Sequence, residues 1–261
     1  NHPYGHPVLG NHDTVSALTL DQVRHFYQDY FVAENAVIVL VGAIDKATAE
    51  QLAEKVIKER PHGHPAKATP KAKALTHEIN IETPFPSSQT VLRLGQLGIN
   101  HHDKNYFPLQ VGSYILGGGG LVSQLAHELR ETRGLTYGVY SQFSPMPGIG
   151  PFLISLSTQN SQTKTALQIT RETLSLFIKN GPSEQELLAA KQYLTGSFPL
   201  SLASNRSIAD MLLKISFYHL PEDYLQTYVD RINAVKRDDI KAAFEQQIKP
   251  EKLLEVTVGK A

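Results

Sequence analysis

The sequence contains no cysteine, and only two of its 261 residues are methionine. The absence of cysteine excludes disulfides, thiolate metal sites and a cysteine nucleophile. A chain without thiols suits the bacterial cytoplasm and the periplasm equally, so the composition leaves the compartment open.

An excess of one charge sign is also absent, because 25 basic residues balance 25 acidic ones. Without a basic surplus, nothing in the sequence points to nucleic acid or to an anionic membrane surface as a partner. The most apolar run, residues 36–44, is far shorter than the roughly 20 residues that a membrane-spanning helix needs. With 41% hydrophobic residues, the chain instead predicts a globular protein with a sizeable core and no membrane span.

The first 60 residues predict two helices with a strand between them. Residues 19–31 begin at Thr19, a helix-capping residue, and repeat apolar residues at helical spacing. Residues 35–42 are continuous and β-branched, as in a strand covered on both faces, and residues 45–60 return to helical composition. Residues 61–74 carry prolines, small residues and lysines with little to bury, so we expect a linker there.

Residues 75–261 alternate between strand and helix patterns. Alternating or β-branched runs predict strands, and apolar residues at helical spacing predict helices that end at prolines and glycines. The predicted strands cover residues 77–82, 89–99, 135–144, 151–158 and 252–259, and the predicted helices cover residues 103–118, 121–131, 163–179, 183–203, 206–218, 222–232 and 237–247. These residues therefore predict one domain of mixed strands and helices.

The two ends of the chain resemble each other. Residues 15–44 align without a gap on residues 232–261, and six of the 30 aligned positions are identical. The helix, turn and strand patterns fall in the same register, and Gly42 aligns with Gly259. We therefore expect two copies of one domain of about 215 residues, the first mostly absent, so that the sequence is the C-terminal portion of a longer protein.

Eleven histidines suggest a metal site, but their spacing does not support one. A zinc site needs ligands on a framework that fixes their geometry, such as two histidines four apart on one helix with a carboxylate elsewhere in the chain. No H-x-x-E-H motif occurs, so we expect no metal ligand in this chain; zinc bound directly by the histidines near the N-terminus is the alternative. The histidines that lie close together in sequence are His2, His6, His12, His62, His64, His101 and His102.

A run of four glycines precedes a predicted helix, where backbone N–H groups can bind phosphate. No Lys-Ser or Lys-Thr follows and no strand leads into the run, so a helix-to-helix connection is a better interpretation than a nucleotide loop. We assign these glycines, Gly117, Gly118, Gly119 and Gly120, to substrate binding. A serine nucleophile is not favoured, because no G-x-S-x-G motif is present.

The stretch LRETRGLTYGVY, residues 129–140, combines the end of a helix with the start of a strand. Arg130 falls in the last helical turn, Gly134 suits the left-handed position that ends a helix, and an alternating strand follows. Arg130 and Tyr137 are therefore candidates for binding one ligand. The alternative is structural, because the macrodipole favours a cation at a helix C-terminus and the alternation places Tyr137 on the apolar face of its strand.

The segment GGGGLVSQLAHELRETRGLTYGVYS, residues 117–141, resembles the C-terminal domain of the pitrilysin family of zinc metallopeptidases, which includes insulin-degrading enzyme and the mitochondrial processing peptidase. It has Arg130 and Tyr137 at the family's spacing, followed by an alternating strand. The resemblance covers the whole chain, since residues 1–60 are similar to the end of the family's first domain and residues 75–261 to its complete second domain.

This resemblance implies a two-layer α+β fold, in which a largely antiparallel sheet of about six strands packs against helices. In the family, two such domains enclose a chamber, and the duplication accounts for the internal repeat. The family's zinc ligands form an H-x-x-E-H motif with a later glutamate, upstream of the matching region. The resemblance thus implies that zinc belongs to another domain or to a partner chain, and that this chain alone is inactive.

In the family, an arginine and a tyrosine of the second domain bind the substrate backbone beside the scissile bond and stabilise the oxyanion. The resemblance implies these roles for Arg130 and Tyr137, with a peptide as substrate and a zinc-bearing domain or partner chain as the catalytic half. The alternative is a catalytically silent scaffold of the same fold.

If most of the first domain is missing, the strand predicted at residues 35–42 loses its neighbouring strands. The apolar faces and edges of residues 1–60 then need another surface to pack against. We expect this segment to pack on the second domain or to pair with another copy of the chain in a homodimer.

Overall fold

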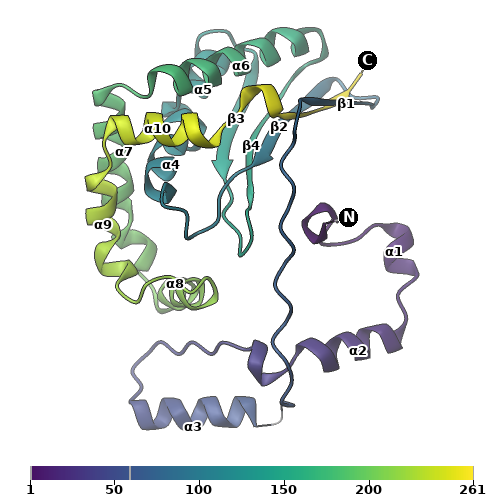
Figure 1. The fold of residues 1–261 in the computed structure, drawn as a ribbon, viewed down its shortest axis with the longest axis vertical. Helices are drawn as coiled ribbons and strands as arrows, with labels where there is room; N and C mark the ends of the chain where they lie inside the picture. Colours follow the sequence, from purple (N-terminus) through teal and green to yellow (C-terminus); the bar gives the residue numbers. More distant parts are fainter. Residues whose placement is uncertain (1, 59, 261) are drawn as a thin grey trace. The chain divides into compact units, whose positions relative to one another are not determined.

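The computed structural model describes residues 2–58 and 60–260, and the chain divides into two compact units (Figure 1). The first unit comprises Asn1–Lys71 with Leu200–Glu222, and the second comprises Ala72–Pro199 with Asp223–Ala261. The interpretation of residues 1–60 as the remnant of a first domain, with a linker at 61–74 and a second domain at 75–261, stays a prediction.

The described residues of the first unit form short helices joined by irregular chain. Helix α2 begins after Thr19 as predicted, because the Thr19 hydroxyl accepts the N–H of Gln22 at 3.3 Å. Helix α3 begins after Asp45, whose carboxylate accepts the N–H of Thr48 at 2.8 Å. The elements are the 3₁₀-helix η1 (Pro3–Gly5), α1 (His12–Ser16), α2 (Leu20–Tyr30), the 3₁₀-helix η2 (Ala33–Asn35), α3 (Lys46–Ile57) and α8 (Asn205–Phe217).

Residues 36–41 form no strand, which corrects the strand predicted for residues 35–42. Of the apolar side chains of this stretch, Val37, Ile38 and Leu40 are exposed, and the others are at most half-buried or small. A strand exists through backbone hydrogen bonds to a neighbouring strand, and no described strand pairs with this segment. Its β-branched composition therefore does not by itself produce a strand.

One sheet lies at the centre of the second unit, and its described strands follow the order β1-β5-β2-β4-β3. The strands are β1 (Ile79–Pro84), β2 (Gln89–Leu97), β3 (Thr136–Phe143), β4 (Pro151–Gln159) and β5 (Leu254–Gly259). Only β1 and β5 pair in parallel, whereas the other three pairings are antiparallel. The expected α+β fold with a largely antiparallel sheet is confirmed, with five strands described, fewer than the resemblance implied.

The helices of the second unit cover one face of this sheet. They are α4 (Tyr106–Ser113), the π-helix η3 (Tyr114–Gly118), the 3₁₀-helix η4 (Gly120–Val122), α5 (Gln124–Ala126), the π-helix η5 (His127–Glu131), the 3₁₀-helix η6 (Asn160–Gln162), α6 (Thr163–Asn180), α7 (Glu184–Ser197), α9 (Tyr224–Ala234), α10 (Arg237–Gln247) and the 3₁₀-helix η8 (Pro250–Lys252). A further 3₁₀-helix, η7 (Pro199–Leu202), follows α7. Among the described residues, no helix is long and apolar enough to cross a membrane.

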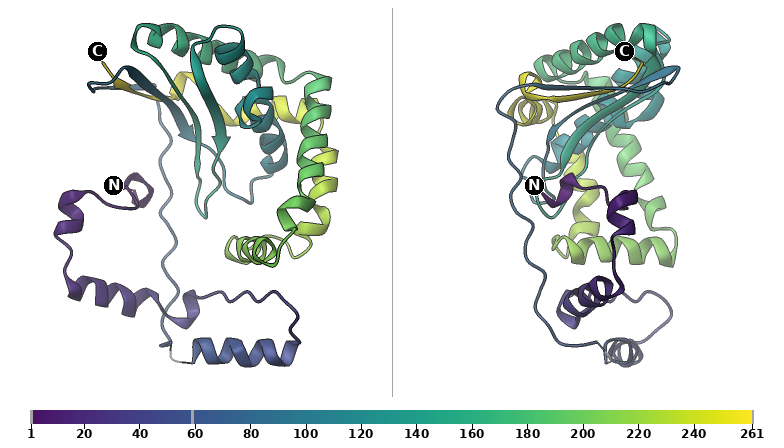
Figure 2. Two further views of the ribbon diagram at one scale, coloured as in Figure 1. Left: turned by 180° about the vertical axis from the view of Figure 1, so that it is seen from behind. Right: turned by 90° about the vertical axis from the view of Figure 1, so that its right-hand side faces the viewer.

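The core lies between the sheet and these helices. On β4, Phe152, Ile154 and Leu156 are buried toward the helices, and the residues between them are half-exposed. Phe244 of α10 reaches this layer, where its ring centroid lies 4.8 Å from that of Phe177. Helices α6 and α10 appear on the near side in Figure 1, and the left view of Figure 2 looks onto the strands from the opposite side.

Candidate functional site

Arg130 lies in the π-helix η5, where the chain is about to leave the helix layer for β3. The N–H of Thr132 donates to the carbonyl of His127, five residues back, at 2.9 Å, which defines the wider turn of a π-helix. Gly134 then adopts φ +61° and its N–H donates to the carbonyl of Arg130 at 3.0 Å. The left-handed glycine predicted at this helix end is therefore confirmed.

Tyr137 lies in a β-bulge near the start of β3. The pairing register with β4 shifts between Thr136 and Val139, so that Tyr137 and Gly138 together oppose the single residue Ser157. A bulge inserts one extra residue into a strand and thereby changes which face the next side chains take. The alternation read from the sequence is interrupted at this point.

The bulge turns Tyr137 outward. Its side chain is 87% exposed, so the expectation that it lies on the apolar face of the strand is wrong. The buried face of β3 is made by Thr136, Val139, Ser141 and Phe143 instead. The reason is the extra residue of the bulge, which shifts the phase of the alternation between Thr136 and Val139.

The hydroxyl of Thr136 holds this irregular backbone in place. It lies 2.8 Å from the carbonyl oxygen of Gly138 and 2.7 Å from that of Ser157, and it accepts the N–H of Gly138 at 3.2 Å. The N–H and the carbonyl of Gly138 thus each have a hydrogen-bond partner within the bulge. Sequence reasoning missed Thr136, and the available signal was Gly138, because an isolated glycine inside a strand pattern indicates a bulge.

The two candidate residues meet. The Cζ atom of Arg130 lies 4.7 Å from the centroid of the Tyr137 ring, so the guanidinium covers the aromatic face in a cation–π contact. Arg130 is partly buried, and it forms no ion pair with a carboxylate of the described residues. The N–H groups of the guanidinium and the phenol O–H are therefore available as donors at one exposed place.

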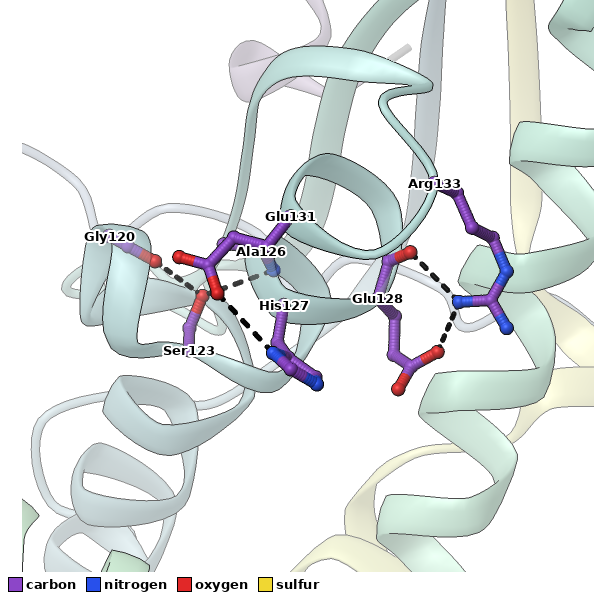
Figure 3. A network of polar contacts seen from close by, with 7 residues as sticks. All are labelled: Gly120, Ser123, Ala126, His127, Glu128, Glu131 and Arg133. Atoms are coloured by element: carbon purple, nitrogen blue, oxygen red, sulfur yellow. Dashed lines mark hydrogen bonds and ion pairs between the residues drawn. The ribbon is translucent and has the colours of Figure 1, made fainter.

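The other charged residues around η5 pair with one another (Figure 3). The Nδ1 atom of His127 lies 3.3 Å from a carboxylate oxygen of Glu131, and Arg133 forms an ion pair with Glu128. Arg133 also donates to the backbone carbonyl of Glu128 at 2.9 Å. These pairs join neighbouring turns of the segment that carries Arg130, and none of them uses its guanidinium.

The start of the same segment is fixed by Ser123. Its hydroxyl donates to the carbonyl of Gly120 at 2.7 Å and accepts the N–H of Ala126 at 3.4 Å, as Figure 3 shows. Ser123 is therefore the N-cap of α5 and also closes the turn that leaves the glycine run.

The glycine run lies against β3. A Cβ atom on Gly117 would lie 2.5 Å from the backbone nitrogen of Ser141, so a glycine permits the close approach of η3 to the strand. Gly120 has φ +64° and open space around it. The run connects two helical segments, as expected, and lies beside the strand that carries Tyr137, whereas its assignment to substrate binding stays a prediction.

A separate groove of about 650 Å³ runs between the η4–η5 segment and α6. Its lining includes His127, Glu128 and Glu172, but neither Arg130 nor Tyr137. Arg130 and Tyr137 therefore lie outside this groove.

The described residues do not fit a zinc site. Within the ranges 2–58 and 60–260 no three His, Cys, Asp or Glu side chains are grouped so that they could hold a metal ion. His2, near the N-terminus, contacts the carbonyl of Pro70 through Nε2 at 2.8 Å, and its Nδ1 atom accepts the N–H of Tyr4.

Comparisons with known proteins agree with this picture. A family model described as the peptidase M16 inactive domain matches residues 17–194. The crystal structure of a peptidase M16 inactive domain from Pseudomonas fluorescens is 36% identical, with a TM-score of 0.95, and the match covers 100% of this chain and 62% of that one.

Two bacterial relatives match nearly the whole chain. An uncharacterized zinc protease of Bacillus subtilis, YmxG, is 27% identical over 246 residues, which are 94% of this chain and 59% of the relative. A protein of Helicobacter pylori, called a non-peptidase homolog, is 26% identical over 247 residues, which are 92% of this chain and 55% of the relative. This chain thus spans little more than half the length of these relatives, and its family match together with its fold shows that it belongs to the M16 family of zinc peptidases and contains the inactive domain, as the resemblance to the pitrilysin family implied.

Proposed function

We propose that this chain is the substrate-positioning half of a zinc endopeptidase, in which Arg130 and Tyr137 hold a peptide backbone beside its scissile bond. The observation that carries the proposal is the exposed pair, whose guanidinium lies 4.7 Å from the centroid of the phenol ring. Membership of a zinc peptidase family supports it. The zinc site belongs to another domain of a longer protein or to a partner chain, because the described residues here do not form one.

The chemistry of this pair is hydrogen-bond donation. When the scissile carbonyl becomes tetrahedral, its oxygen gains negative charge, and donors that already point at that oxygen stabilise the transition state more than the ground state. The guanidinium adds a positive charge, which shortens and strengthens its hydrogen bonds to an oxyanion. Arg130 and Tyr137 would thus orient the substrate and stabilise the charge that develops on it.

The backbone around the pair supports this role. Arg130 is fixed on a helix end closed by Gly134, and Tyr137 on a bulge tied by the Thr136 hydroxyl. Donors held by ordered backbone need little reorganisation when the reaction occurs. The glycine run lies beside β3, and Gly118, which is exposed, and Gly120 have no side chains to obstruct a ligand. We therefore include the run as a surface on which the peptide backbone can lie.

The test combines this chain with the polypeptide that carries the H-x-x-E-H motif, in one protein or as two chains, and measures peptide hydrolysis. Arg130→Ala and Tyr137→Phe should each lower kcat about 100-fold, because each removes one donor to the oxyanion. Circular dichroism should show an unchanged fold, since both side chains lie at the surface.

Matched controls are Arg206→Gln and Tyr193→Phe, an exposed arginine and an exposed tyrosine elsewhere on the chain. They should leave turnover unchanged. Full turnover in both Arg130→Ala and Tyr137→Phe would remove the assigned role.

The second candidate function is a catalytically silent scaffold. The relative of Helicobacter pylori that is called a non-peptidase homolog favours it. A scaffold predicts that the chain is required for assembly with its catalytic partner, whereas Arg130 and Tyr137 can be replaced without loss of turnover. Measuring complex formation and hydrolysis on the same variants separates the two functions.

A further inference from the structure

Arg93 lies at the middle of β2, on the face of the sheet that the helices of its unit leave open. The residues on either side of it, Leu92 and Leu94, are fully buried toward the helices, whereas Arg93 is exposed. Side chains alternate between the two faces of a strand, so Arg93 projects from the face opposite to the one on which Leu92 and Leu94 are buried.

The register places hydrogen-bond donors beside Arg93. Arg93 pairs with Ser155 of β4, and Ser155 pairs in turn with Tyr140 of the edge strand β3. Directly paired residues of antiparallel strands share a face, so the guanidinium, the hydroxyl and the phenol form one row across the sheet. Tyr140 is 61% exposed, and it lies three residues from Tyr137 on the same strand.

Arg93 is the one charged side chain on this face of the described strands, and no carboxylate of the described residues pairs with it. The helix-covered side of the sheet gives a direct contrast. There, Arg171 of α6 lies 2.6 Å from Glu78 and 2.7 Å from Glu255. Arg171 thus has two carboxylate partners, whereas Arg93 has none among the described residues.

The spacing between this row and the Arg130–Tyr137 pair corresponds to a short stretch of peptide. Arg93 lies two strands from Tyr140, which is about 10 Å, and Tyr137 lies about 10 Å along β3 from Tyr140. The direct separation is therefore about 14 Å. An extended peptide rises about 3.3 Å per residue, so roughly four residues span it.

We propose that Arg93 binds a carboxylate of the peptide substrate and makes the enzyme prefer an acidic group about four residues from the scissile bond. The proposal rests on the proposed function, because it takes Arg130 and Tyr137 to mark the scissile bond. Ser155 and Tyr140 donate further hydrogen bonds along the path. The open face carries no acidic strand residue, so it offers an anionic group donors without repulsion.

The carboxylate has two chemical sources, an aspartate or glutamate side chain and the C-terminus of the peptide. Peptides for the test therefore come in two series. One series carries Asp or Asn at positions three, four and five residues to either side of the scissile bond. The peptides of the other series contain Asn instead of Asp and end three, four or five residues after the scissile bond. Their C-terminus is either a free carboxylate or an amide.

The primary measurement is kcat/KM of the assembled peptidase for each pair of peptides at low salt. The acidic member should be preferred roughly fivefold at one of these positions, as expected for a partly exposed charged pair. Raising the salt concentration should weaken the preference. Arg93→Gln should abolish it, Arg93→Glu should reverse it in favour of the Asn or amide peptide, and Arg93→Lys should retain part of it.

Binding of the same peptides to the zinc-free 261-residue chain, followed by fluorescence anisotropy, gives a readout without turnover. The matched control is Lys164→Gln, which removes a cation from α6 rather than from the open face and should preserve the preference. Melting temperatures of all variants identify any that fail to fold, and Arg93→Lys keeps the test informative if Arg93→Gln does so.

Equal kcat/KM for acidic and amide peptides, or a preference that survives Arg93→Gln, would overturn the proposal. Either result leaves the proposed function standing, because Arg130→Ala and Tyr137→Phe test turnover and not selectivity. Unchanged turnover in those two variants would overturn the proposed function, whatever the selectivity of Arg93→Gln.

Discussion

Helix α2 (Leu20–Tyr30) and helix α10 (Arg237–Gln247) occupy equivalent positions in the two ends of the chain that resemble each other. Both have 11 residues, and the same shift in numbering that superposes them also superposes η2 (Ala33–Asn35) on η8 (Pro250–Lys252). After these turns the two regions differ. Residues 254–259 form β5, whereas the equivalent residues 37–42 form no strand.

The shared part depends on local interactions. At the start of α2 the backbone N–H of Thr19 donates to the side chain of Gln22 at 2.9 Å, and at the start of α10 the N–H of Lys236 donates to Asp239 at 2.8 Å. The acceptor is three residues beyond the cap in both helices, as in a capping box. Such bonds join residues near in sequence, so both copies form them.

The strand that forms in only one of the two regions depends on residues that are distant in the sequence. Strand β5 pairs with β1 and β2, and α10 buries Phe244 completely against Phe143 of β3 and Phe177 of α6. The residue equivalent to Phe244 in the first region is Tyr27, which is 48% exposed. The comparison shows that the same local sequence pattern forms the same helix in both regions. A strand and a buried core form only in the region where other segments of the chain pair with the strand and pack against the helix.

The largest expected effect comes from truncating the equivalent aromatic side chains. Phe244→Ala should destabilise the second unit by about 3–5 kcal/mol, because it leaves a cavity beside Phe177. Tyr27→Ala should cost less than about 1 kcal/mol in this chain, since the ring is half-exposed. Hydrogen exchange measured separately for α2 and α10 in denaturant checks both values. Similar losses in the two regions would break the comparison.

A smaller effect is expected at the equivalent glycines. A Cβ atom on Gly259 would lie 2.8 Å from the Cα atom of Thr90, so Gly259→Ala should cost about 1–3 kcal/mol by forcing β5 and β2 apart. At Gly42 an added Cβ meets no atom within 4 Å, and the strain of a side chain at φ +159° falls on the first unit, so Gly42→Ala should leave the exchange of the sheet amides of the second unit unchanged. Thermal melting of both variants provides the check, and an unaltered Gly259→Ala protein would contradict the close packing.

The smallest effect is expected at the helix starts, where the two regions should behave alike. Gln22→Ala and Asp239→Ala each remove the acceptor for a cap N–H, and each should weaken its own helix by about 0.5–1 kcal/mol. Hydrogen exchange of the first-turn amides measures this loss. A much larger loss in α10 than in α2 would show that the cap of α10 also carries tertiary contacts.

Parts of the candidate site could be predicted and others could not. The spacing of Arg130 and Tyr137 and the helix end at Gly134 follow from residues close in sequence, and the structure has the two side chains in contact. The exposure of Tyr137 could not be read from simple alternation, because it depends on a register shift against β4. The π-helical turn of η5 was likewise unforeseen, since its sequence is compatible with an ordinary helix.

The sequence by itself determined the helix starts, the turns and the internal repeat, because capping and spacing are interactions between near neighbours. Only the tertiary structure decided that residues 254–259 become a strand while residues 37–42 do not, and that Tyr137 points outward while Arg93 lies on an open sheet face. The physical reason is that strand pairing, bulges and burial are properties of segments that lie far apart in the sequence and meet only in the folded chain.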